Sequence, residues 1–412
     1  MAAAIQTGRR LVSCQASRIS RFSQYLATET IGKTISSVRH PFWGMRCWRS
    51  RPLSGFASSS SSENEDDVDL RSDTVTKPCQ QLRAAMSAAV VGDDVHGEDP
   101  TVSKLEEYVA MLLGKEEGLL VPSGTMGNLI AVGVHCRRGD EIILGDHSHM
   151  FFYESGNASA FMGVSYNTVP NLPDGGLNLE DIRGAIREDD VHYARSSLLC
   201  VENTHNKRGG RAISAERMAE MSEVAREAGL KVHLDGARLW NAAVALGTRP
   251  RDLAAHVDSA SVCLSKGLGA PVGSVLVGSS EFVYQARRLR KALGGGMRQA
   301  GVIAAAGLEA VINNYLRLQE DHDNAKFLAK GLAATPGIRA DRVSSDTNAV
   351  YFQLQDMDPD EFLYSLQRDH KVLMGGGYFG STIRAMTHKD VNRRDVERAL
   401  EACRIVLEGG QR

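Results

Sequence analysis

The sequence lacks long hydrophobic runs and contains few aromatic residues. No apolar run approaches the roughly 20 residues that a membrane-spanning helix needs, and Phe, Trp and Tyr together make up 6% of the chain. The formal net charge is only -2, so the total charge gives no reason to expect nucleic acid as a partner. The remaining features are those of an ordinary folded enzyme: the chain is 42% hydrophobic and rich in glycine. Its 412 residues are enough for two lobes.

The cysteines show no pairing pattern. There are seven of them, scattered along the chain and without a C-x-x-C spacing. This usage predicts a reducing compartment, with neither a disulfide framework nor a structural zinc site. The sequence also contains no cluster of metal-ligating residues, so we expect no metal.

The N-terminal residues 1–62 are strongly basic. They contain nine Arg and Lys residues against the single acid Glu29, a net charge of +8, so the rest of the chain carries −10. A leader that is rich in Arg and Ser and poor in acids is typical of a mitochondrial transit peptide, which predicts a location in the matrix. The alternatives are a basic arm that binds an anionic partner and a cytoplasmic protein. Residues 63–68 are interpreted as an acidic linker to the folded body.

Short apolar strands alternate with helical patterns through the middle of the chain. The expected strands are 118–121, 141–144, 164–169, 197–202 and 231–235, and the expected helices are 124–136, 150–160, 179–186 and 215–228. This alternation predicts an α/β fold in which helices cover both faces of a mostly parallel sheet.

The sequence predicts two domains behind the leader and linker. An N-terminal arm and a large domain occupy residues 69–310, and a smaller α+β domain occupies residues 311–412. A long helical stretch, 280–319, leads from one to the other and is expected to break near Gly294–Gly296, because glycine destabilises helix interiors.

One lysine follows a buried strand and enters a glycine-rich loop. The stretch from Ser261 to Ser274 reads S-V-C-L-S-K-G-L-G-A-P-V-G-S and contains Lys266. An amine flanked by apolar residues is desolvated and becomes a better nucleophile. Lys266 therefore suits a Schiff base with a carbonyl cofactor or substrate. The alternative is an ordinary solvated lysine.

Other polar residues follow further strands, and ligands of open α/β sheets gather at the carboxyl ends of the strands. Gly124 and Thr125 separate a strand from a helix, where backbone N–H groups and the helix dipole favour a phosphate. Asp235 ends an apolar strand and could hold a protonated pyridine nitrogen, with Arg238 close by. His149 opens a helix and could stack on an aromatic ring, and His205 follows a strand. Together these residues describe a pyridoxal phosphate site, although each alone could be structural.

The sequence resembles the threonine aldolases, which share the aspartate-aminotransferase fold (fold type I pyridoxal enzymes). The resemblance runs from about Leu70 to Met386 and rests on several motifs that occur in the family's order. They are D-L-R-S-D-T-V-T-K-P, G-D-D-V-H-G-E-D-P-T-V, P-S-G-T-M-G-N, H-L-D-G-A-R-L-W-N-A, S-K-G-L-G-A-P-V-G-S and G-G-G-M-R-Q-A-G. The fold that the resemblance implies is a large domain with a mostly parallel sheet and a smaller C-terminal domain.

The resemblance also implies roles for individual residues around pyridoxal 5′-phosphate. For the cofactor, they are Lys266 for the Schiff base, Asp235 for the pyridine nitrogen, Arg238 near the ring hydroxyl, Gly124 and Thr125 for the phosphate, and His149 for stacking. For the substrate, they are Ser72 and Arg384 for the carboxylate, His205 for the β-hydroxyl, and His96 near the substrate, where many relatives have tyrosine. Arg298 and Lys291 resemble basic residues that reach the phosphate from a neighbouring subunit. This implies a homodimer at least and, by family habit, a tetramer.

The implied reaction is retro-aldol cleavage of L-threonine or L-allo-threonine to glycine and acetaldehyde. His149, His205 or an ordered water could remove the β-hydroxyl proton, and the sequence does not choose among them. The same lysine, carboxylate and phosphate loop would also serve β-elimination or transamination of a small amino acid. A non-catalytic scaffold of the same fold is the alternative of another class.

Overall fold

The computed structural model describes residues 67–376 and 380–409. The predicted leader, 1–62, and most of the predicted acidic linker lie outside these residues. Among the described residues, none of the helices combines the length and the apolar character needed to cross a membrane.

The centre of the fold is a seven-stranded sheet in the order β2-β8-β7-β6-β5-β3-β4. The strands are β2 (Glu117–Val121), β3 (Glu141–Gly145), β4 (Ser165–Val169), β5 (Ser196–Glu202), β6 (Lys231–Gly236), β7 (Ser259–Cys263) and β8 (Ser274–Gly278). Strand β8 runs antiparallel to both of its neighbours, whereas the other pairs are parallel. The prediction of an α/β fold with a mostly parallel sheet is confirmed.

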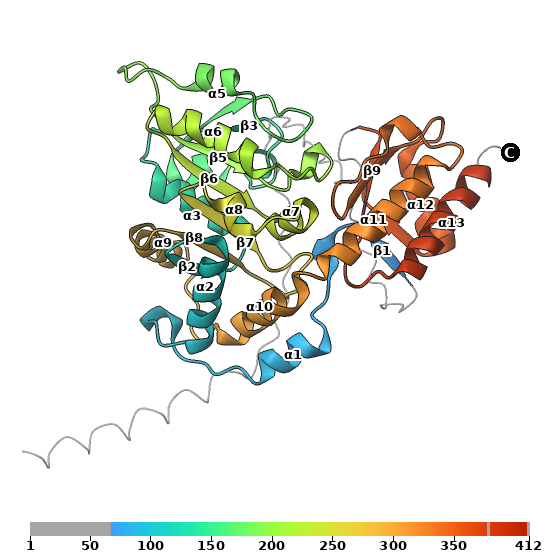
Figure 1. Cartoon of the computed structure of the whole chain (residues 1–412), viewed down its shortest axis with the longest axis horizontal. Helices are drawn as coiled ribbons and strands as arrows, with labels where there is room; N and C mark the ends of the chain where they lie inside the picture. Colours follow the sequence, from blue (N-terminus) through green and yellow to red (C-terminus); the bar gives the residue numbers. More distant parts are fainter. Residues whose placement is uncertain (1–66, 377–379, 410–412) are drawn as a thin grey trace, which may run out of the picture. The chain divides into compact units, whose positions relative to one another are not determined.

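Helices flank the sheet or pack on the helices that do so (Figure 1). They are α1 (Gln80–Ser87), α2 (Pro100–Leu113), α3 (Gly124–His135), α4 (His149–Phe152), α5 (Leu179–Ala185), α6 (Ala215–Glu227), α7 (Leu239–Leu246), α8 (Pro250–Ala254), α9 (Ser280–Ala292) and α10 (Gly301–Asn314). Successive strand residues pack into apolar clusters on opposite faces of the sheet. Leu120 and Ile143 pack in the cluster that contains α2, α6 and α10, whereas Leu119 and Ile142 pack on the side of α3. Both faces of the sheet are therefore buried, as the apolar strands predict.

A second apolar core lies in the C-terminal part of the chain. It is built from β1 (Val68–Leu70), β9 (Ala349–Gln353), β10 (Val372–Met374), β11 (Thr382–Met386), α11 (Leu318–Ala333), α12 (Pro359–His370) and α13 (Arg393–Gly409). Strand β1 pairs with β10, so the N-terminal arm enters this core, and Figure 1 shows the blue strand among the orange and red elements. The residue boundaries of the two predicted domains stay a prediction.

Two helical predictions had different outcomes. The break near Gly294–Gly296 is confirmed: α9 ends at Ala292, and Gly294 has a φ of 80° that few other residues adopt. The predicted helix 150–160 is wrong. Helix α4 ends at Phe152 and a separate helical turn occupies Ala158–Met162, because Ser155 and Gly156 between them take φ values of 56° and 63°. This break shapes the loop that follows His149.

Candidate active site

Three neighbouring strands carry charged residues at their carboxyl ends. Glu202 is the last residue of β5, Asp235 lies at the end of β6, and Lys266 follows β7 by three residues. The strands are parallel and adjacent, so these residues meet at one edge of the sheet. Lys266 is half-buried, and its charge acts on the carboxylate of Asp235.

Asp235 is a buried carboxylate with neutral hydrogen-bond donors. Its Oδ2 accepts from Asn128 Nδ2 at 3.0 Å and its Oδ1 from the backbone N–H of Ala237 at 3.1 Å. Burial raises the pKa of Asp235 to about 6, the negative charges of Glu202 and Glu154 act in the same direction, and His149 and Lys266 oppose them. The carboxylate is therefore placed where an additional positive charge would be stabilised.

The side chain of His149 lies beside Asp235 and is oriented by Glu154. Its Nδ1 is 2.9 Å from Glu154 Oε1, and one ligand atom each of His149, Glu154 and Asp235 lie within 4.8 Å of one another. Burial opposes protonation of the ring, but the hydrogen bond to Glu154 and the charges of Asp235, Glu154 and Glu202 outweigh it and raise the pKa of His149. A third of the His149 side chain is exposed, so a ligand can reach it.

Glu202 ties the loop of His149 to the end of β5. Its Oε2 accepts from the backbone N–H of His149 at 2.7 Å and its Oε1 from that of Asn206 at 2.9 Å. Burial alone would raise its pKa, but the charges of His205 and His149 and these two N–H groups lower it. Glu202 is thus held as an anion that fixes the backbone on both sides of the site.

Arg238 forms a buried ion pair with Asp73 of the N-terminal arm. The Nη2 and Nε atoms donate to Asp73 at 2.6 and 2.8 Å, and Asn348 donates to the same carboxylate at 3.2 Å. Burial alone would raise the pKa of Asp73, but the charge and hydrogen bonds of Arg238, with help from Lys266, hold it well below its usual range. The pair joins the arm, the end of β6 and the C-terminal core around Lys266.

The predicted phosphate loop is the start of α3. Ser123 caps the helix by accepting from the N–H of Met126 at 3.2 Å, and Gly124 and Thr125 form its half-buried first turn. A Cβ added at Gly124 would meet Cys263 Sγ at 3.0 Å, so the helix start approaches β7 closely. One turn further, Asn128 contacts Asp235, which connects this helix to the carboxylate.

The substrate-carboxylate residues of the sequence prediction also lie close together. Arg384, in β11, is buried, and its guanidinium donates to Asn206 Oδ1 and to the backbone oxygen of Arg71, both at 3.0 Å. Ser72 follows Arg71 directly, and its Oγ accepts from Thr74 Oγ1 at 2.9 Å. Strand β11 of the C-terminal core and the N-terminal arm therefore meet near the loop after β5.

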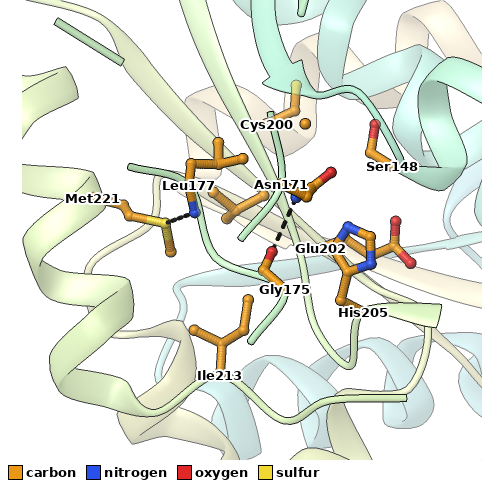
Figure 2. A pocket seen from close by; sticks show the side chains of 11 residues that line it. Ser148, Asn171, Gly175, Leu177, Cys200, Glu202, His205, Ile213 and Met221 are labelled. Carbon is orange, nitrogen blue, oxygen red and sulfur yellow. Dashed lines mark hydrogen bonds between the residues drawn. The ribbon is translucent and has the colours of Figure 1, made fainter. Parts of the chain in front are cut away.

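His205 lines a small buried cavity together with Glu202 and Ser148 (Figure 2). Only 1% of His205 is exposed, and neither ring nitrogen has a hydrogen-bond partner among the described residues. Burial lowers its pKa, although Glu202 opposes this effect. The cavity has room for about one water molecule.

Three further residues of the sequence prediction are His96, expected near the substrate, and Lys291 and Arg298, expected to reach the phosphate from a neighbouring subunit. His96, Lys291 and Arg298 are exposed, and Arg298 Nη1 pairs with Asp93 Oδ2 at 2.8 Å. No contact joins them to Lys266 or Asp235 in the part of the chain that the structure describes. The roles of Lys291 and Arg298 stay predictions that need a second copy of the chain, and the role of His96 near the substrate also stays a prediction.

Sequence reasoning missed Asp73, Asn128, Glu154 and Glu202. Asp73 and Asn128 lie inside motifs that carried the resemblance, and Glu202 ends a predicted strand. The position of these three residues in the sequence could therefore have indicated that they belong to the site. Glu154 gave none, because the segment around it was predicted as a continuous helix.

Comparison with known proteins places this chain in a class of lyases. The family model for the beta-eliminating lyases matches residues 69–355. The chain belongs to this family.

Within the family the chain is similar to proteins named for one activity. The low-specificity L-threonine aldolase 1 of Arabidopsis thaliana is 47% identical over 339 residues, which are 81% of this chain and 94% of that protein. The low specificity L-threonine aldolase of Escherichia coli K12 is 43% identical over 329 residues, 80% of this chain and 96% of that protein. The fold is also that of the Leishmania major threonine aldolase, with a TM-score of 0.71, 22% identity and coverage of 82% of this chain and 99% of that one.

Threonine aldolases of this family use pyridoxal 5′-phosphate. The strand-end residues fit this cofactor. The pKa of Asp235 is raised because the carboxylate is buried among further acids, so a protonated ring nitrogen would supply the positive charge that the position favours. A lysine amine, a helix start and a partly exposed imidazole surround the same carboxylate.

Proposed function

We propose that this chain is a pyridoxal 5′-phosphate-dependent, low-specificity L-threonine aldolase. It cleaves L-threonine or L-allo-threonine to glycine and acetaldehyde. The observation that carries the proposal is the group at the strand ends, where buried Asp235 lies beside His149 and within the electrostatic reach of Lys266. The similarity to named threonine aldolases over four fifths of the chain supports the choice of reaction.

Several residues would hold the cofactor. Asp235 would hold a proton on the ring nitrogen, and the raised pKa of this carboxyl in the protein alone supports that pairing. Lys266 would bind the cofactor's carbonyl carbon, His149 would stack on the ring, and Gly124 and Thr125 would bind the phosphate at the start of α3. Arg238, kept in place by Asp73, would donate to the ring hydroxyl.

When bound, pyridoxal 5′-phosphate supplies a ring that accepts the electron pair of the breaking Cα–Cβ bond. The protein's task is to orient that bond. Arg384 binds the substrate carboxylate, since a guanidinium matches a carboxylate with two parallel hydrogen bonds, and Ser72 provides a further donor. The anchoring of Arg384 by Asn206 and the backbone of Arg71 supports this role.

The β-hydroxyl proton must leave as acetaldehyde forms, and Cα must take up a proton to give glycine. General base assistance of this kind contributes about 10²–10⁴-fold to the rate. We rank His149 above His205 as the base, because a third of the His149 side chain is exposed beside Asp235, whereas His205 is almost fully enclosed. His205 would then contact the β-hydroxyl of the substrate indirectly, through a water molecule bound between them. If His149→Asn kept the wild-type kcat while His205→Asn did not, the ranking would be reversed.

The reaction is tested by the visible spectrum of the protein purified with pyridoxal 5′-phosphate, beside Lys266→Ala, and by product analysis. In the wild type we expect a yellow absorption band that borohydride abolishes. In Lys266→Ala the band that depends on the bond between the lysine and the cofactor should be absent. L-allo-threonine should then yield acetaldehyde and glycine in equal amounts. Ammonia and a keto acid would instead identify a β-eliminating enzyme, and a protein without any band would contradict the proposal.

We propose that the protein works as a homo-oligomer, a dimer at least and a tetramer by family resemblance. Arg298 and Lys291 would reach the phosphate of a neighbouring subunit, and His96 would approach that subunit's substrate. The exposure of all three residues in the single chain supports this arrangement. Sedimentation equilibrium of the holoenzyme tests it, and a monomer with full activity would contradict it.

We propose that residues 1–62 direct the protein to the mitochondrial matrix. The net charge of +8 and the near absence of acids in this segment support the proposal. A fluorescent protein fused behind residues 1–68 should enter mitochondria, and the same fusion with the nine basic residues replaced by Gln should stay in the cytoplasm. Cytoplasmic fluorescence from both fusions would contradict the proposal and favour the alternative of a basic arm that binds an anionic partner.

A further inference from the structure

We propose that a buried hydrogen-bond chain, His135–Ser259–His233–Asn128, is a positioning device that aims the Asn128 amide at Asp235. The inference rests on the proposed cofactor site and adds residues to it. Each link is short: His135 Nε2 to Ser259 Oγ and His233 Nδ1 to Ser259 Oγ are both 2.8 Å, and His233 Nε2 to Asn128 Oδ1 is 3.1 Å. Asn128, His233 and Ser259 are at most 1% exposed.

The chemistry of the neighbours fixes the orientation of the Asn128 amide. Its Nδ2 lies 2.9 Å from Glu154 Oε1 and 3.0 Å from Asp235 Oδ2. An amide nitrogen has two N–H groups, one for each carboxylate. The opposite orientation would place the amide oxygen against two acceptor groups and leave both unpaired. The amide oxygen must therefore face His233.

This orientation determines every proton along the chain. His233 has to donate from Nε2 to the amide oxygen, so its Nδ1 accepts the single proton of Ser259. The hydroxyl of Ser259, having given its proton to His233, accepts from His135 Nε2. Burial lowers the pKa of His135 to about 4 and that of His233 to about 3, so both rings are neutral at pH 7, as the single set of donors requires.

The hydrogen-bond chain matters because the Asp235 carboxylate has few hydrogen-bond donors besides Asn128. Two acids, Glu202 and Glu154, and two bases, His149 and Lys266, face it from neighbouring elements. The bond from Asn128 favours the ionised carboxylate that has to meet a protonated ring nitrogen. Without the donor from His233, the buried oxygen of the Asn128 amide would lose its hydrogen-bond partner, so the amide would shift away from its position against Asp235. The chain therefore acts on cofactor binding through Asn128.

A matched pair of substitutions at His233 tests the proposal. Glutamine places an amide nitrogen where the histidine has Nε2 and can still donate to Asn128, whereas leucine fills the space without a donor. On the full chain, we expect His233→Gln to keep the Kd for pyridoxal 5′-phosphate within about threefold and His233→Leu to raise it about tenfold or more, because a hydrogen bond to a charged group is at stake. Near-ultraviolet circular dichroism selects folded variants. If His233→Leu does not fold, His233→Met, which is also apolar and lacks a donor, replaces it with the same expectation.

A second readout needs neither cofactor nor activity. In protein labelled with ¹⁵N-histidine, the His233 signals, assigned by their loss in His233→Gln, should be those of a neutral ring protonated at Nε2 from pH 6 to 8. A ring protonated at Nδ1, or equal Kd values for folded His233→Leu and the wild type, would overturn the positioning role. Failure of the wild-type protein to bind the cofactor would instead overturn the proposed function, so the two failures are distinguishable.

Discussion

Asp73, Glu202 and Asp235 are three buried acids around the site, and the partners of each carboxyl decide the direction of its pKa shift. The pKa of Asp73 and that of Glu202 are lowered because an arginine or two histidines and several N–H groups meet them. The pKa of Asp235 is raised because burial and its acidic neighbours outweigh Lys266 and His149. A buried carboxyl group is thus a stabilised anion at Asp73 and Glu202 and an unfavourable anion at Asp235, which is the position proposed to bind a cation.

This contrast predicts how stability depends on pH. The pKa of Asp235 in the folded protein is about 6, above the ordinary 3.8, so the folded state binds the proton more tightly than the unfolded state does. The corresponding stability is fully present below about pH 3.8 and is lost as the pH rises through about 6. Without cofactor, the free energy of unfolding in urea should therefore fall more between pH 4.5 and 7.5 for the wild type than for Asp235→Ala. Saturating pyridoxal 5′-phosphate should reverse the difference, and identical pH slopes would contradict the assignment.

Removing Asp73 should destabilise the protein strongly. The substitution Asp73→Ala leaves Arg238 buried without its carboxylate, and breaking a buried pair in this way costs about 3–5 kcal/mol. Chemical denaturation measures the loss. Asp369→Ala, which removes the partner of Arg368 on the surface, serves as the control and should leave the midpoint unchanged. A midpoint for Asp73→Ala equal to that of the control would show that the arm is held by other contacts.

Individual site residues were predictable from sequence to different degrees. Lys266, Asp235 and His149 are placed by strand ends and helix starts, so local pattern was sufficient to bring them to one edge of the sheet. Asn128 and His233 face inward and resemble ordinary core-lining polar residues in the sequence. Their function depends on contacts between α3, β6 and β7, and contacts between elements cannot be read from local periodicity.

At the scale of elements, the site is organised by helix starts that approach the sheet closely. Apolar periodicity predicted the parallel strands well, because a strand buried on both faces leaves a continuous apolar run. It did not reveal that the segment after His149 is broken, since the break depends on two residues in left-handed conformations. The antiparallel strand β8 was also missed, because it follows the glycine-rich loop of Lys266 without a helix between.

The close approach of α3 to β7 gives an element-scale prediction. In Gly124→Ala the new methyl group would meet Cys263 Sγ at 3.0 Å, so the helix start must shift or the sulfur must move. Overpacking of this kind costs about 1–3 kcal/mol of stability, and we expect a higher Kd for pyridoxal 5′-phosphate. Cys263→Ala removes the sulfur and should restore the affinity in the double variant. Purely additive effects in this double-mutant cycle would exclude the steric explanation.

For the whole molecule, the exposure of His96, Lys291 and Arg298 raises the question of what completes the site. Lys266 and Asp235 act on each other within one chain, whereas Arg298 is proposed to serve the neighbouring subunit. A site assembled from two chains has a property that no single-chain site shares. One variant can lack a residue of its own site, and another can lack a residue that it contributes to its partner's site. When these two variants associate, one of the two sites in the hybrid dimer is intact.

Mixing variants therefore tests the assembly directly. Lys266→Ala and Arg298→Ala should each lose most aldolase activity alone. After subunit exchange, about half of the dimers are hybrids, and one of the two sites in each hybrid has both wild-type residues, so the activity should recover to about a quarter of the wild-type level. Lys266→Ala mixed with Asp235→Ala is the matched control. It should recover nothing, because both residues belong to the same chain's half of every site. Equal recovery in both mixtures, or none in either, would place Arg298 outside the shared site.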